Sequence, residues 1–147
     1  MRNNRGFTLL EVLVSATIIA VLTVIGVVSY SSVNKRSRDV KRKSDLEQIR
    51  SALEMFRSDN TTNPGEYPGA GTGSFTNASN LSSDLVNTYM PAIPSDPDSD
   101  ASYFYQAIDT GGLYTGYCIC AHLETLQSTE STCASLNASC NYGLKNP

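Results

Sequence analysis

Four cysteines cluster near the C-terminus of this 147-residue chain, at positions 118, 120, 133 and 140. An even number of cysteines in one short segment is typical of disulfides formed in an oxidising compartment. Their C-x-C and C-x₆-C spacings differ from the paired C-x-x-C motifs of common zinc sites. Cys118 and Cys120 share one face of a predicted strand, too far apart to bond easily to each other. We therefore expect each to pair with Cys133 or Cys140, in one of two arrangements.

Few other side chains have types suited to chemistry. His122 is the single histidine, which argues against a histidine-based zinc centre or catalytic triad. Asp96, Asp98 and Asp100 alternate in a proline-rich loop, and their oxygens suit Ca²⁺. The loop lacks the glycine and distal glutamate of an EF-hand, so a solvated acidic turn is the favoured interpretation. We expect no catalytic residues and no cofactor, with Ca²⁺ as a weak alternative.

The longest apolar segment of the chain lies near the N-terminus. Residues 12–34 form a run of 23 without a charged side chain, long enough to cross about 30 Å of hydrocarbon as a helix. The run is also longer than the apolar core of a conventional cleaved signal peptide, about 7–15 residues. Glu11 stands at its start, where the helix dipole favours an acid, although an unpaired carboxylate within hydrocarbon is costly.

A second helical pattern follows without interruption. Leu46, Ile49, Leu53 and Phe56 recur at spacings of three and four residues, as on one face of an amphipathic helix. No proline occurs before position 64 to interrupt the pattern, so we predict a single helix over residues 7–57. Its first half is apolar on all sides and its second half packs one stripe on a small C-terminal part.

The C-terminal part has the pattern of a small sheet. Residues 58–100 are rich in Ser, Thr, Asn, Gly and Pro and predict loops, with a short helix over 81–89. Strands are expected over 103–108 and 113–123, joined by a turn at 109–112, and a third over 142–144.

Charge is divided unevenly along the chain. Residues 1–57 hold ten basic and five acidic residues, a net charge of +5, whereas residues 58–147 hold one and nine, a net charge of −8. This asymmetry excludes a uniformly basic nucleic-acid binder.

For the basic run 35–43 we favour a solvated face near anionic lipid headgroups. Salt bridges to acidic parts of neighbouring subunits and DNA binding are the alternatives. The positive-inside rule applied to this run favours a cytoplasmic C-terminal part, opposite to the inference from the cysteines.

The N-terminal residues carry a resemblance to a known family. Arg5-Gly6-Phe7-Thr8-Leu9-Leu10-Glu11 resembles the class III signal sequence of type IV pilins and type II secretion pseudopilins. In that family a prepilin peptidase cleaves after the glycine, the new N-terminal residue is methylated, and a glutamate four residues later is needed for assembly. The resemblance implies cleavage between Gly6 and Phe7, N-methylation of Phe7 and an assembly role for Glu11.

The same resemblance implies an α+β fold. In it, a long N-terminal helix, half hydrophobic and half amphipathic, packs on a small antiparallel sheet. The expected parts are a leader (1–6), a transmembrane or filament-core helix (7–34), an amphipathic helix (35–57) and a globular head (58–147). One departure is Val28, which stands where many type IV pilins have a helix-kinking proline.

The implied function is a non-enzymatic subunit of a type IV pilus-like filament. A major-pseudopilin-like subunit of a type II secretion system is the first alternative. A membrane-anchored extracytoplasmic binding domain is the second. The implied partners are further copies of the chain, prepilin peptidase, the assembly platform and the inner membrane, and no stable complex with nucleic acid is expected.

Overall fold

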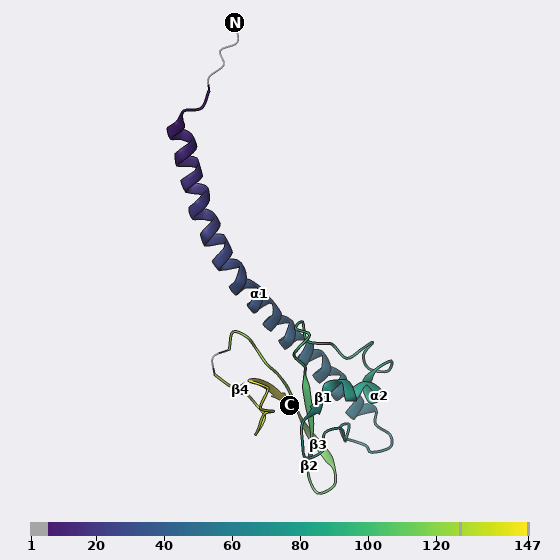
Figure 1. Cartoon of the computed structure of the whole chain (residues 1–147). Coiled ribbons are helices and arrows are strands. Elements are labelled where there is room, and N and C mark those ends of the chain that lie inside the picture. The colour runs from purple at the N-terminus through teal and green to yellow at the C-terminus, as the bar shows by residue number, and fades with distance from the viewer. Residues whose placement is uncertain (1–5, 127, 147) are drawn as a thin grey trace. The chain divides into compact units, whose positions relative to one another are not determined.

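The computed structural model describes residues 6–126 and 128–146 (Figure 1). Contacts divide the chain into two compact units, one ending at Arg36 and the other beginning at Ser37. One helix, α1 (Leu9–Asp59), passes from the first unit into the second. It begins and ends two residues later than the sequence predicted.

In the first unit, α1 presents apolar side chains to its surroundings. Leu9, Leu22 and Val24 are 84%, 63% and 65% exposed, and the large apolar side chains between them are also exposed. Several hydroxyls in the segment donate to carbonyls of the preceding turn. Ser15 Oγ donates to the carbonyl of Glu11 at 2.7 Å, and Thr23 Oγ1 donates to that of Ile19 at 2.8 Å. Length and composition suit a membrane span, and the internal bonds remove the penalty of placing hydroxyls in hydrocarbon.

The second unit contains a five-stranded sheet in the order β1-β2-β3-β5-β4. Its strands are β1 (Thr76–Asn77), β2 (Phe104–Asp109), β3 (Tyr114–Ala121), β4 (Glu130–Ser131) and β5 (Tyr142–Lys145). The predicted hairpin of β2 and β3 is confirmed, with Tyr105 opposite Ile119, and β3 also pairs antiparallel with β5. The two-residue strands β1 and β4 were not predicted because two residues are too few to reveal an alternating pattern.

The predicted antiparallel sheet is confirmed, and one of its pairings is parallel. β4 runs parallel to β5, with Glu130 opposite Tyr142. Parallel neighbours require the chain to cross over between them, usually through a dozen or more residues. Residues 132–141 make this crossover here, and they include two of the cysteines.

One face of the sheet packs on the second half of α1. Leu46, Ile49 and Leu53 of the helix are fully buried. They form a core with Tyr105, Ala107, Tyr117, Ile119 and Ala121 of β2 and β3. The predicted amphipathic stripe is therefore confirmed, and Phe56 lies half-buried at its end, 5.8 Å from the ring of Tyr89.

The segment before the sheet differs from its prediction. A helix over 81–89 was expected, but a 3₁₀ turn η1 (Ala78–Leu81) leads into a single turn of helix α2 (Ser82–Leu85). The Asn77 side chain caps η1 by accepting from the Ser79 amide at 2.9 Å. Asn87 then adopts a φ of 69°, a left-handed conformation that cannot continue a helix. The helical segment thus begins and ends earlier than the predicted range 81–89.

Candidate processing and assembly site

Glu11 is held at the N-terminus of α1 by Thr8. One carboxylate oxygen of Glu11 accepts from the Thr8 amide at 2.9 Å and from the Thr8 hydroxyl at 3.0 Å. The Glu11 amide donates in return to Thr8 Oγ1 at 3.2 Å. This reciprocal arrangement is a capping box, which satisfies amides that a helix start leaves without partners. Sequence reasoning missed it, although Thr-x-x-Glu before an apolar run is its signature.

Gly6 and Phe7 precede the helix. Phe7 is 87% exposed, and no atom lies within 4 Å of the position that a Cβ on Gly6 would occupy. The bond between them is thus outside the helical hydrogen-bond ladder and open to the surroundings. Arg2 and Arg5 of the predicted leader lie outside the described residues.

A second arrangement of charges, in the head, was not predicted. The Arg42 side chain lies within the second unit with 1% of its surface exposed. Its Nη2 and Nε donate to the two oxygens of Asp96 at 2.8 and 2.9 Å, a forked contact that suits guanidinium and carboxylate. Its Nη1 donates to Asp39 and to Glu124, each at 2.9 Å. One guanidinium therefore joins α1 to two loops of the head.

The carboxylates around Arg42 have further donors. Arg38 Nε donates to Glu124 at 2.6 Å, and this contact, with that from Arg42, lowers the pKa of Glu124 to about 2 against a partial opposing effect of burial. Burial opposes ionisation of Asp39, but bonds from Thr125, the Glu124 amide and Arg42 keep its pKa below its usual value. We call Arg38, Asp39, Arg42, Asp96 and Glu124 the Arg42 cluster. It holds three negative and two positive charges.

The cluster corrects the interpretation of the basic run 35–43. A solvated face is wrong for Arg42, and two of the cations of the run bind acids of their own chain. Lys35, Arg36 and Lys41 are exposed, and Lys43 Nζ lies 4.8 Å from the centre of the Tyr142 ring. The spacing of Asp39 and Arg42, three residues apart on a helix, was the available signal for a local pair.

The three alternating aspartates do not converge on a common point. Asp96 binds Arg42, the Asp98 amide donates to Asp96, and the Asp100 amide donates to Asp98. The Asp96 carboxylate thus binds the arginine and closes a local turn, and the Asp98 carboxylate closes the next turn. Over residues 6–126 and 128–146, no group of three or more His, Cys, Asp or Glu side chains is arranged to hold a metal ion. His122, just after β3, is exposed.

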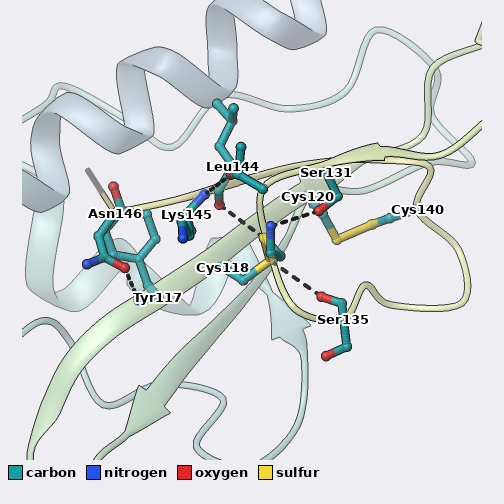
Figure 2. Close-up of a disulfide and its surroundings, with 11 residues drawn as sticks. Tyr117, Cys118, Cys120, Ser131, Ser135, Cys140, Leu144, Lys145 and Asn146 are labelled. Carbon is teal, nitrogen blue, oxygen red and sulfur yellow. Dashed lines mark hydrogen bonds between the residues drawn. A yellow bond between two sulfur atoms is a disulfide. The ribbon is translucent and has the colours of Figure 1, made fainter.

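The four cysteines form two disulfides. Cys118 pairs with Cys133 and Cys120 with Cys140, with Cα–Cα distances of 5.8 and 5.9 Å. This is one of the two arrangements that were expected, and Figure 2 shows the bond between Cys120 and Cys140. Cys118 and Cys120 lie on the face of β3 opposite Ile119, which belongs to the core with α1. The crossover segment therefore covers the second face of the sheet.

Close packing holds this segment near β5. A Cβ on Gly143 would collide with Leu136 and would lie 3.0 Å from Ser131 Oγ. The Thr132 amide also donates to the Gly143 carbonyl at 3.1 Å. A larger residue at position 143 would therefore displace the Leu136 side chain where the cross-linked segment passes over the strand.

Comparison with known proteins identifies the motif at the N-terminus. The family model of the prokaryotic N-terminal methylation motif matches residues 1–27. No curated protein and no solved structure was found to match the chain. The motif is typical of the type IV pilin and pseudopilin family, whose members are generally non-enzymatic structural subunits. The long apolar helix followed by a small, mostly antiparallel sheet is a pilin-like α+β fold.

Proposed function

We propose that this prepilin-like chain is a structural subunit of a type IV pilus-like filament. The observation that carries the proposal is the register of the methylation motif with α1. The exposed Gly6–Phe7 bond stands immediately before a capped helix whose first half presents large, exposed apolar side chains from Leu9 to Val27. Cleavage at this bond would leave Phe7 as the first residue and Glu11 in the first turn.

The chemistry of assembly follows from the charges that cleavage leaves. The new amine of Phe7 is positive, and Glu11 is the carboxylate of the apolar half of α1. When helices stack, Glu11 of one subunit pairs with the amine of a neighbour, because each charge would otherwise be isolated in an apolar core. In the single subunit the Thr8 bonds stabilise the same carboxylate. On assembly, the Glu11 carboxylate then exchanges Thr8 for the amine of the neighbouring subunit.

The proposed location is the inner membrane, with the head outside the cytoplasm. Two disulfides support this orientation, since disulfides persist in oxidising compartments. Prepilin peptidase would remove residues 1–6. An assembly platform would then extract the subunit from the membrane into the filament, whose core is the apolar part of α1.

A type II secretion pseudopilin is the second candidate. The acidic, proline-rich loop of residues 91–100, which Asp96 ties to Arg42, favours it, whereas the cross-linked C-terminal segment favours the surface of a pilus. Deletion of the gene separates the two. Loss of sheared surface filaments with normal secretion indicates a pilus subunit, and loss of an exported protein indicates a pseudopilin.

The mass of the N-terminal peptide, from protein purified from its own cells, tests the proposal. We expect a chain beginning at Phe7 with one added methyl group. A chain that begins at Met1, or one cut near Ser31, would contradict the filament proposal and favour an anchored binding domain. A Glu11→Gln variant should be processed but fail to assemble. Glu47→Gln, which changes an exposed carboxylate further along α1, should assemble normally.

A further inference from the structure

The side of α1 that faces away from the Arg42 cluster carries an uncovered patch. Val40 is 67% exposed and lies two residues before the buried Arg42, about 200° around the helix. Lys41 and Lys43 flank it and are exposed. Glu47, two turns further along, is paired with Arg50 at 3.5 Å. The patch of Val40, Lys41 and Lys43, which we call the basic patch, therefore has an exposed apolar centre and a positively charged rim.

A surface of opposite charge lies on another side of the same unit. Asp98 and Asp100 are exposed in the loop that Asp96 fixes to Arg42. Because Asp96 is bound to the buried face of α1 and Val40 is on the opposite face, this acidic loop and the basic patch occur at the same level of the helix. Among these described residues, no salt bridge within one copy joins Lys41 or Lys43 to Asp98 or Asp100.

We infer that the basic patch of one copy binds the acidic loop of the next copy. The inference rests on the proposed filament and names a contact between its heads. A contact between two different surfaces of identical chains is heterologous, and when its rotation does not close into a ring it propagates as a helical filament. The Arg42 cluster has a defined part in this arrangement. It holds the acidic loop rigidly and uses Arg38 and Arg42 internally. Lys41 and Lys43 remain exposed to a neighbour, and Lys43 Nζ also lies 4.8 Å from the centre of the Tyr142 ring of its own chain.

Charge exchange in the full chain, in its own cells, tests this contact. One variant carries Lys41→Glu with Lys43→Glu, and a second carries Asp98→Lys with Asp100→Lys. Each variant places charges of the same sign on the two contacting surfaces. We therefore expect the yield of sheared filaments or cross-linked polymer to fall by roughly tenfold. The combination of all four changes restores opposite charges and should recover most of the yield.

A matched control separates this contact from net charge. Asp59→Lys with Glu130→Lys makes the chain more positive by the same amount as Asp98→Lys with Asp100→Lys, but at two exposed positions outside both surfaces. It should leave the yield unchanged, and it should not rescue the Lys41→Glu, Lys43→Glu variant. Normal cleavage at Phe7 and intact disulfides in each variant exclude misfolding as the cause of a loss.

A second readout does not depend on loss of assembly. A photo-crosslinking amino acid at Val40 should join neighbouring copies, with the cross-link mapped by mass spectrometry to residues 91–100. Processed charge variants that assemble like the wild type, or cross-links that map elsewhere or to lipid, would overturn the inference while leaving the filament intact. Absence of the Phe7 terminus in the wild type would instead refute the proposed function itself.

Discussion

Glu11 and Arg42 are charged residues of the same helix, but the two regions stabilise them differently. Every described partner of the Glu11 carboxylate belongs to Thr8, three residues away. Arg42 also binds a near neighbour, Asp39, but its other partners are 54 and 82 residues distant. A local cap is able to exchange its partner while the fold persists. A cation that joins α1 to two loops is part of the fold, so its loss exposes the head to unfolding.

Removing Arg42 is the strongest test of this contrast. Arg42→Met leaves Asp39 and Asp96 without their buried cation and should cost about 3–5 kcal/mol of unfolding free energy. Denaturant unfolding of the full chain in detergent, followed by near-ultraviolet circular dichroism of the tyrosines, measures it. Arg50→Met, at the surface pair with Glu47, should cost at most about 1 kcal/mol. Equal losses in the two variants would contradict the contrast.

Removing a disulfide tests the second long-range constraint of the head. The Cys118–Cys133 bond closes a sequence separation of 15 residues, for which loop closure predicts about 3 kcal/mol of stabilisation. Cys118→Ala with Cys133→Ala should lower the unfolding free energy by about that amount. Unchanged stability under the same denaturant assay would mean that the crossover segment is held by packing alone.

Acid should weaken the Arg42 cluster in a defined range of pH. Since the pKa of Glu124 is lowered from 4.5 to about 2 in the fold, its stabilisation is complete above about pH 4.5 and is lost as the pH falls toward 2. Glu124 is partly exposed, so we expect about 1 kcal/mol, or roughly 4 °C in melting temperature. Melting curves between pH 6 and pH 2 should show a shallower acid dependence for Glu124→Gln, whereas Glu47→Gln should follow the wild type. The lowered pKa of Asp39 contributes a remaining dependence of the same sign.

The smallest effect is expected at the cap of α1. Thr8→Val removes the hydroxyl that binds Glu11 and should weaken the first helical turn by about 1 kcal/mol. Amide exchange at Glu11 in detergent micelles should become several-fold faster, while exchange in the head stays unchanged. Thr8→Ser retains the hydroxyl and should behave like the wild type. Destabilisation of the head by Thr8→Val would show that the cap is not local.

Local patterns predicted much of the fold. The uncharged run 12–34, the stripe from Leu46 to Phe56 and the alternation around β2 and β3 each depend on near neighbours, which sequence displays directly. The capping box was equally readable, because Thr8 and Glu11 are three residues apart. The strands β1 and β4 were too short to carry a pattern, and the early end of the predicted helix 81–89 depends on one left-handed residue, Asn87.

The sequence by itself determined the apolar helix, its motif at Gly6, Phe7 and Glu11, and the placement of four cysteines in one segment. Only the tertiary structure decided between the two disulfide arrangements, selected Arg42 from seven basic residues in 35–50 and tied Asp96 and Glu124 to it. Helix and strand periodicity arise from neighbours along the chain. The pairing of distant charges and sulfurs depends on which loops the folded sheet brings against α1, and no spacing in the sequence encodes that distance.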